Sequence, residues 1–163
     1  KKKNNMQKLI MIAGEAWTGK STCSEILYKE FTNSAWLDGD DVWRVNPFTV
    51  KDSRLRNSDC NMAYVLNNYL ESGFEYVFFS SIVLCNLEIR EKILSLISAK
   101  SFEIYFFTLI ASKQVLRGRA IERDSNRSPQ FHLLEESLKQ DSIFIDTSRK
   151  TPEEVASEIK SIV

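Results

Sequence analysis

The sequence has few of the residues that loosen or cross-link a chain. Its 163 residues include three prolines and five glycines, which argues against a disordered, collagen-like or linker-rich protein. The three cysteines, Cys23, Cys60 and Cys85, form no C-x-x-C pair and are accompanied by a single histidine, so neither a disulfide framework nor a zinc site is indicated. We expect free thiols in a reducing cytoplasm.

Long apolar runs and an excess of one charge are also missing. No apolar stretch approaches the roughly 18 residues of a membrane span, and the amino end lacks the pattern of a signal peptide. The 22 basic side chains balance 22 acidic ones, so there is no strong nucleic-acid signal, although a local basic patch stays open. We predict a soluble cytoplasmic protein with a flexible, solvated tail over 1–7 and no membrane partner.

Apolar segments alternate between strand and helix patterns along the rest of the chain. With 43% hydrophobic residues, a chain of this length can bury one core. The alternation favours a single α/β domain over 8–163, with a parallel sheet covered by helices on both faces. Strands are predicted at 7–13, 34–37, 75–80, 103–109 and 142–146, and helices at 21–31, 61–70, 87–99, 112–140 in two pieces and 152–163.

One motif between the first strand and the first helix indicates a specific chemistry. Residues 14–21 read GEAWTGKS and match G-x-x-x-x-G-K-[ST] at every fixed position. Backbone N–H groups of such a loop wrap a triphosphate, and the start of the following helix adds partial positive charge. We expect Lys20 to reach the β- and γ-phosphates and Ser21 to bind Mg²⁺. Glu15 and Trp17 are unusual there; Trp17 either covers the substrate mouth or rests on a neighbouring helix.

The phosphate loop alone does not distinguish GTPases, hydrolytic ATPases and kinases. The chain has neither an N-K-x-D guanine motif nor a D-x-x-G switch, and residues 78–81, FFSS, end the third strand without a carboxylate. Asp38 and Asp40 follow the second strand instead. Because the carboxyl ends of parallel strands open on one crevice, one acid can hold a metal-bound water while the other accepts a proton from an attacking hydroxyl. An acidic surface loop, with Asp41 as a cap, is the alternative.

On these motifs the chain resembles the small P-loop kinases, the group of shikimate, gluconate and adenylylsulfate kinases and of antibiotic phosphotransferases such as that for chloramphenicol. The resemblance implies the three-layer P-loop nucleoside triphosphate hydrolase fold, with five parallel strands in the order 2-3-1-4-5. It also implies a substrate-binding insertion at about 41–60 and a lid at about 117–130. The segments that carry it, within 9–162, are 14–22, 37–40, 46–47, 119–123 and 146–148.

The resemblance further implies roles for single residues. In these kinases an R-x-x-x-R pair places the first guanidinium against adenine and the second on the transferring phosphate, which are roles for Arg119 and Arg123 here. Arginine suits planar stacking and bidentate phosphate contact, although the pair could also belong to a solvated, ion-paired helix. Arg127 is a further lid candidate. The residues expected to bind the nucleotide are Gly14, Glu15, Ala16, Trp17, Thr18, Gly19, Lys20, Ser21, Thr22 and Arg119.

The sequence therefore predicts an enzyme that uses ATP and Mg²⁺ to transfer a γ-phosphate to a hydroxyl or phosphate of a metabolite, a nucleotide-like compound or an antibiotic. A nucleoside or nucleotide kinase proper and a nucleotide-binding regulatory module without turnover are the alternatives. His132 is interpreted as an ordinary helical residue. The predicted catalytic residues are Lys20, Asp40 and Arg123, the metal ligands Ser21 and Asp38, and the residues that bind the small-molecule acceptor Asp38, Asp40 and Arg44.

Overall fold

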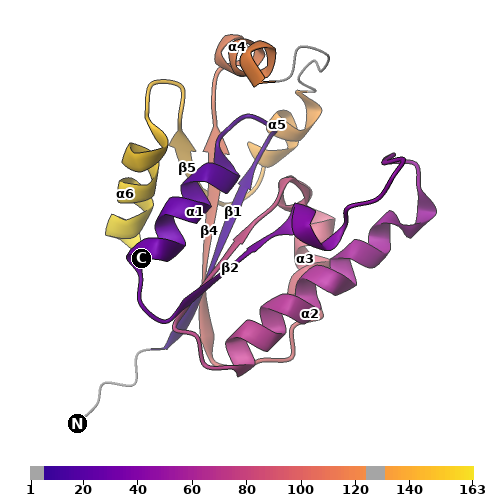
Figure 1. The fold of residues 1–163 in the computed structure, drawn as a ribbon, viewed down its shortest axis with the longest axis vertical. Coiled ribbons are helices and arrows are strands. Elements are labelled where there is room, and N and C mark those ends of the chain that lie inside the picture. Colours follow the sequence, from indigo (N-terminus) through magenta and orange to yellow (C-terminus); the bar gives the residue numbers. More distant parts are fainter. Residues whose placement is uncertain (1–5, 124–130) are drawn as a thin grey trace.

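A sheet of five parallel strands forms the centre of the computed structural model, which describes residues 6–123 and 131–163 (Figure 1). The strands are β1 (Gln7–Gly14), β2 (Ser34–Asp38), β3 (Tyr76–Ser80), β4 (Phe102–Ile110) and β5 (Ile143–Asp146). Their order is β2-β3-β1-β4-β5, and every neighbouring pair is parallel. The predicted sheet and strand order are therefore confirmed.

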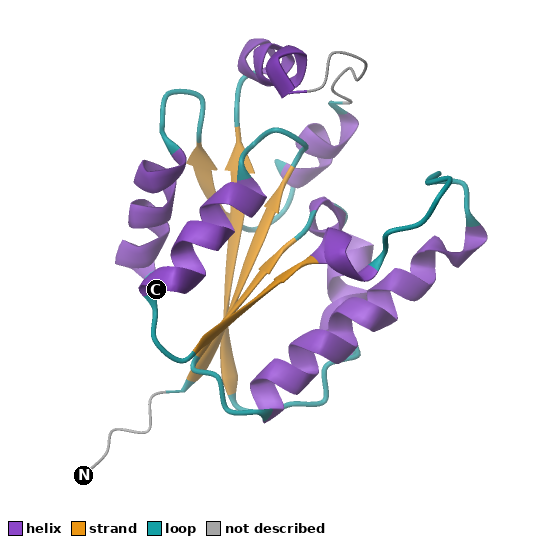
Figure 2. Cartoon of the chain, in the orientation of Figure 1, coloured by secondary structure: helices purple, strands orange, loops and turns teal. Residues whose placement is uncertain are grey.

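Helices cover both faces of this sheet and complete the three predicted layers (Figure 2). They are α1 (Lys20–Glu30), α2 (Asn57–Glu71), α3 (Leu87–Ser95), α4 (Lys113–Arg123), α5 (His132–Ser137) and α6 (Pro152–Ile162), with short 3₁₀ helices η1 (Gly39–Val42), η2 (Ser53–Arg56) and η3 (Ile82–Cys85). Helices α1 and α6 lie together on one face, and α2 and α3 on the other. No helix of the described residues is long and apolar enough to cross a membrane.

The central strand β1 supplies side chains to the core on both faces of the sheet. Successive side chains of a strand point to opposite faces. Leu9 and Met11 pack with residues of α2 and α3, whereas Ile10 and Ile12 pack with residues of α1 and α6. All four are fully buried. The continuous apolar run in the sequence thus reflects a strand with a hydrophobic layer on each side, as is typical of parallel sheets.

The carboxyl ends of the strands meet at one edge of the sheet. Ser80 lies in register with Asp38 on one side and with Ile12 on the other. Gly14, the last residue of β1, pairs with Leu109 of β4. The loops that follow β1, β2 and β3 therefore start beside one another, which brings distant parts of the sequence to a common site.

Two helix boundaries differ from the prediction for a local reason. Helix α2 begins at Asn57, before the first residue of its predicted range. The prediction began too late because the first turn of α2 is polar and carries no apolar stripe to signal a helix. Helix α3 ends at Ser95 rather than at residue 99. The backbone N–H groups of Ser98 and Ala99 donate to the side chain of Asn67 on α2, so this segment is tied to a neighbouring helix instead of continuing its own.

Two predicted segments, the tail at 1–7 and the lid at 117–130, are only partly covered by the described residues. Strand β1 already begins at Gln7, inside the predicted tail. Of the predicted lid, 117–123 forms the end of α4, while 124–130, with Arg127, lies outside the described residues.

The three cysteines are free thiols, as expected; Cys23 and Cys85 are buried and Cys60 is exposed.

The close approach of the β2 and β3 ends requires a glycine at position 39. A Cβ on Gly39 would lie 2.6 Å from Oγ and 2.9 Å from Cβ of Ser81, whereas a Cβ on Gly118, inside α4, would meet none of the described atoms within 4 Å. We expect Gly39→Ala to lower the free energy of unfolding by about 1–3 kcal/mol through overpacking. Gly118→Ala, the control, should raise it by about 0.5–1 kcal/mol. Urea unfolding measures both, and equal midpoints would contradict this account.

Candidate active site

The loop between β1 and α1 forms a cradle of backbone donors. The backbone N–H and the side-chain hydroxyl of Thr18 both donate to the carbonyl of Glu15, at 3.2 and 2.8 Å, which holds the loop in a compact turn. A Cβ on Gly14 would collide with Thr18, and Gly19 has φ +90°, which favours glycine. No side chain caps α1 and its first turn has no acid. Its N–H groups are therefore suited to bind an anion.

Lys20 opens α1 among acidic neighbours. Burial lowers the pKa of its ammonium below the ordinary value, while Cys85, Asp40 and Asp38 favour the charged form. A partly desolvated cation interacts more strongly with a phosphate than one in bulk water. Lys20 therefore lies where a triphosphate bound to the cradle would meet a positive charge.

Ser21 and Asp38 form a pair of oxygen groups beside Lys20. The Ser21 hydroxyl donates to Oδ2 of Asp38 at 2.6 Å, and Oδ1 of Asp38 accepts from the backbone N–H of Asp40 at 3.1 Å. The described residues contain no cluster of three or more His, Cys, Asp or Glu side chains suited to a metal. Mg²⁺ is commonly held by one or two protein oxygens together with phosphates and waters, so this donor set fits Mg²⁺ on a nucleotide.

The end of β3 completes this edge with hydroxyl groups instead of an acid. Ser80 accepts a hydrogen bond from the indole N–H of Trp36 at 3.0 Å. The hydroxyl oxygen of Ser81 accepts from the backbone N–H of Val83 at 3.2 Å and caps η3. Both hydroxyls thus serve neighbouring elements of the fold.

Glu15 places a carboxylate inside the phosphate loop. Its side chain is 3% exposed; Oε1 accepts from the backbone N–H of Ala16 at 3.0 Å, while Oε2 has no hydrogen-bond partner among the described residues. Burial raises the pKa of this carboxyl group, against the opposing effects of the Ala16 N–H, Lys20 and His132. The free protein therefore has a buried carboxyl group with a raised pKa next to the charge that would hold phosphate.

Trp17 and Arg119 connect the loop to α4. Trp17 packs with Ala111, Leu116 and Leu134, so it rests on the neighbouring helices, one of the two predicted placements. The guanidinium of Arg119 donates to the carbonyl of Trp17 at 3.0 Å and to Thr147, at 3.1 Å to its hydroxyl and 2.7 Å to its carbonyl. Arg119 thus joins the phosphate loop to the loop after β5.

A cavity of about 250 Å³ adjoins the phosphate loop on the side of α4 and α6. Both predicted arginines, Arg119 and Arg123, line it. Burial and the like charge of Arg123 lower the pKa of Arg119, and Asp146 opposes them. The lining residues are Trp17, Thr18, Gly19, Cys23, Arg119, Glu122, Arg123, Thr147, Lys150, Pro152 and Val155.

A second cavity, of about 340 Å³, opens beside Asp40 on the side of α2 and α3. Its walls come from η1, the segment between η1 and α2, α2 itself, η3, and the starts of α3 and α5. Arg56 and His132 line it, although His132 was expected to be an ordinary helical residue. Only chain topology brings His132 to this place, so no local pattern could have indicated it.

Several predicted site residues lie away from this second cavity. Arg44 pairs with Asp41 at 2.6 Å, its side chain is 73% exposed, and it is not among the lining residues. Asp38 is turned toward Ser21 instead. Thr22 is exposed on the first turn of α1. Of the three residues predicted to bind the acceptor, Asp40 lines this cavity, whereas Arg44 and Asp38 are not among its described lining residues.

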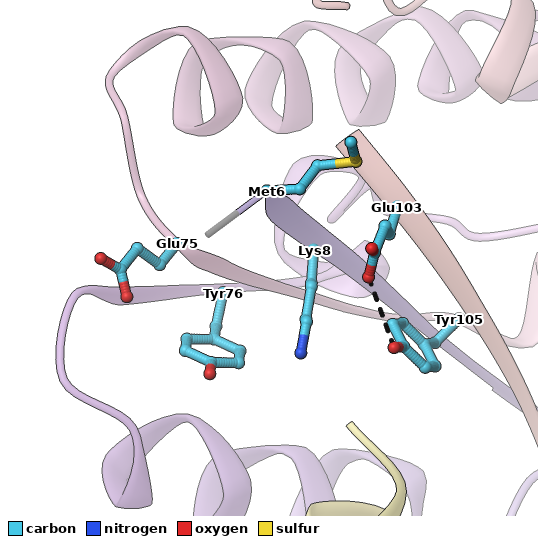
Figure 3. Close-up of a pocket in the computed structure, with 6 residues that line it drawn as sticks. All are labelled: Met6, Lys8, Glu75, Tyr76, Glu103 and Tyr105. Atoms are coloured by element: carbon cyan, nitrogen blue, oxygen red, sulfur yellow. Dashed lines mark hydrogen bonds between the residues drawn. The ribbon is translucent and has the colours of Figure 1, made fainter. Parts of the chain in front are cut away.

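A third hollow, of about 370 Å³, lies at the opposite edge of the sheet, where the strands begin (Figure 3). The side chain of Lys8 extends between the rings of Tyr76 and Tyr105, 5.6 and 5.7 Å from their centroids. Its Nζ also donates to the carbonyl of Val163 at 3.0 Å. This hollow is remote from the phosphate loop, and its central lysine already has partners, so it is not the site of the phosphate chemistry.

Solved structures share this architecture over nearly its whole length. The tunicamycin resistance protein of Deinococcus radiodurans matches with a TM-score of 0.71 and 19% identity, covering 96% of this chain and 95% of that one. An APS kinase of Mycobacterium tuberculosis matches with a TM-score of 0.68 and 13% identity, covering 96% and 97%. The chain has the fold of the P-loop small-molecule kinases.

A gluconokinase of Sinorhizobium meliloti 1021 has this kinase fold as well, with a TM-score of 0.64 and 20% identity over 93% of this chain and 88% of that one. No protein-family model matches the sequence, and no curated protein matches it. At these identities the likeness concerns the fold, and the chemistry has to be argued from the site.

The buried carboxylate of Glu15 predicts a stability that depends on pH. A carboxyl group with a raised pKa in the folded protein destabilises it increasingly as the pH rises from the ordinary value of 4.5 through the folded one. We expect Glu15→Gln to raise the free energy of unfolding at pH 7 by about 1 kcal/mol, and the gain to vanish below pH 4.5. Urea titrations across pH measure this. The exposed Glu91→Gln is the control, and a gain independent of pH would contradict the prediction.

Proposed function

We propose that this protein is a kinase that transfers the γ-phosphate of ATP, with Mg²⁺, to a hydroxyl group of a small molecule. The observation that carries the proposal is the arrangement of one edge of the sheet. Lys20 and the paired Ser21 and Asp38 lie there, and Asp40, two residues after Asp38, lines a separate cavity. Nucleotide and acceptor would thus approach from two sides and meet between these groups.

The nucleotide half of the site follows from the cradle. The N–H groups at the start of α1 and Lys20 would bind the β- and γ-phosphates, with the base in the cavity lined by Arg119. Ser21 and Asp38 would hold Mg²⁺, which when bound neutralises charge on the phosphates. Arg123, which lines the same cavity, would contact the phosphate in transfer.

The transfer itself assigns a role to Asp40. The acceptor oxygen attacks the γ-phosphorus, the bond from that phosphorus to the bridging oxygen breaks, and its electron pair leaves with ADP. Asp40 orients the hydroxyl and takes its proton. A mostly dissociative transfer gains chiefly from such positioning and from charge stabilisation, which the cradle and Lys20 supply.

Proteins of the same fold support this reading. One is an APS kinase solved in complex with AMPPNP and APS, so this fold can hold a nucleotide and a small molecule together. A gluconokinase is another. The predicted insertion at 41–60 is supported by the cavity beside Asp40, since Trp43, Phe48 and Arg56 of that segment line it. We propose that 117–123 takes part in closing the nucleotide cavity.

Lys20→Ala tests the phosphate loop. Loss of the charge that meets the β- and γ-phosphates should lower ATP affinity or turnover by about 10²-fold, while the unfolding midpoint stays near that of the wild type. Lys29→Ala, an exposed lysine on the same helix that pairs with Glu25, is the matched control. Calorimetric titration of ATP measures the affinity, and normal ATP use by Lys20→Ala would overturn the assignment.

Asp40→Asn and Asp38→Asn separate the two acids. Asp40→Asn keeps the shape of the side chain but cannot take the proton, so transfer should fall by about 10²-fold with ATP affinity nearly unchanged. Asp38→Asn should instead raise the Mg²⁺ concentration needed for half-maximal rate. ADP release titrated with nucleotide and Mg²⁺ distinguishes them. Wild-type transfer by Asp40→Asn would remove this mechanism, and a module without turnover would bind ATP but release no ADP.

A further inference from the structure

The cavity beside Asp40 has mostly apolar walls. Apolar side chains contribute to it from the segment between η1 and α2, from α2, η3 and α3, and from α5; among them are Trp43, Leu55, Met62, Ile82 and Leu133. Phe48 and Val50 are 60% and 77% exposed and extend the apolar surface outward from the cavity. Exposed apolar groups gathered at the mouth of a pocket indicate a ligand that covers them.

The hydroxyl and amide groups in these walls already make hydrogen bonds within the protein. Ser58 donates to the carbonyl of Leu55 at 2.7 Å. Ser81 accepts from the N–H of Val83 at 3.2 Å, and the Asn86 side-chain oxygen accepts from the N–H of Ile89 at 3.1 Å. The donor hydrogens that Ser81 and Asn86 keep are few, so a ligand with many hydroxyl groups would lose water without gaining a partner for each of them.

The arginine in the lining, Arg56, already pairs with a carboxylate of the protein. Among the described lining residues the titratable side chains are Asp40, Arg56 and His132. Arg56 pairs at 3.3 Å with Asp59, which is fully buried and is also held by Lys92 at 3.4 Å. Both cations approach Oδ2 of Asp59, so Arg56 shares this buried carboxylate with Lys92. An acidic acceptor would have to compete with Asp59 for Arg56 and would meet the charge of Asp40.

From these three features we propose that the phosphate acceptor is an uncharged alcohol with an apolar body about the size of an aromatic ring system, rather than a carboxylated, phosphorylated or polyhydroxylated metabolite. The apolar body lies against Phe48, Val50 and Met62, and the hydroxyl reaches Asp40. The volume of about 340 Å³ lies within the range of small-molecule pockets. The inference rests on the proposed kinase function and narrows its acceptor.

The test compares matched ligands. Arylalkyl alcohols such as 4-phenyl-1-butanol are each paired with the analogue that carries a carboxylate on the ring, and gluconate represents polyhydroxylated anions. Saturation-transfer NMR measures binding without nucleotide, and ADP release measures transfer with ATP and Mg²⁺. We expect the neutral alcohols to bind about tenfold or more tightly than their carboxylated partners. Tighter binding of the carboxylated analogues or of gluconate, or no binding of the alcohols, would overturn the inference.

The variants lie at three exposed positions, Phe48, Val50 and Tyr64, so that a loss of folding does not confound the binding measurement. Phe48→Ser should weaken binding of the alcohols about tenfold, whereas Tyr64→Ser, at a 71% exposed position outside the cavity lining, should not change it. Val50→Arg should shift the preference toward the carboxylated partners. Equal effects of Phe48→Ser and Tyr64→Ser would count against the proposed pocket.

The binding and transfer measurements distinguish failure of the proposed ligand class from failure of the proposed kinase function. Alcohols that bind the wild type, bind Phe48→Ser more weakly and yet cause no ADP release would support the ligand class and overturn the kinase function. Transfer to gluconate or to a carboxylated analogue, abolished by Asp40→Asn, would support the kinase function and overturn the ligand class.

Discussion

The hydrogen bond between Ser21 and Asp38 depends on the arrangement of the whole sheet. The two residues belong to different elements, one at the start of α1 and one at the end of β2, and β3 lies between β2 and β1. Their oxygens come within 2.6 Å because β3 holds Asp38 and Ile12 in register with the same residue, Ser80. A parallel sheet with both faces buried fixes that register, so the hydrophobic core determines the spacing of the polar site.

Contacts with β1, α4 and α5 hold the loop between β1 and α1 in place. Beneath it, β1 is buried between two hydrophobic layers, and above it Arg119 ties the carbonyl of Trp17 to Thr147. Trp17 adds apolar contacts to Leu116 and Leu134 on α4 and α5. The backbone donors thus keep their directions before any ligand arrives, which is the condition for strong electrostatic stabilisation of phosphate.

Much of this could be predicted from the sequence, because the informative patterns are local. The glycine-rich motif, the buried strand before it and the acids after β2 are each contained in a few neighbouring residues. The role of Arg44 stays a prediction: an aromatic and basic segment suggests acceptor contacts, and in the structure Asp41, three residues away, engages its guanidinium. Arg56 and His132 reach one cavity from distant parts of the chain, and no pattern within either segment could reveal that.

The carboxylate of Glu15 would also influence how fast a nucleotide leaves. The group lies inside the loop that would surround phosphate, where its ionised form would be screened less than in water. In that form it would repel the β-phosphate of a bound diphosphate and weaken its binding. Product release limits turnover in many enzymes. An ionised Glu15 in the cradle would therefore lower the affinity for ADP and shorten the time that ADP stays bound.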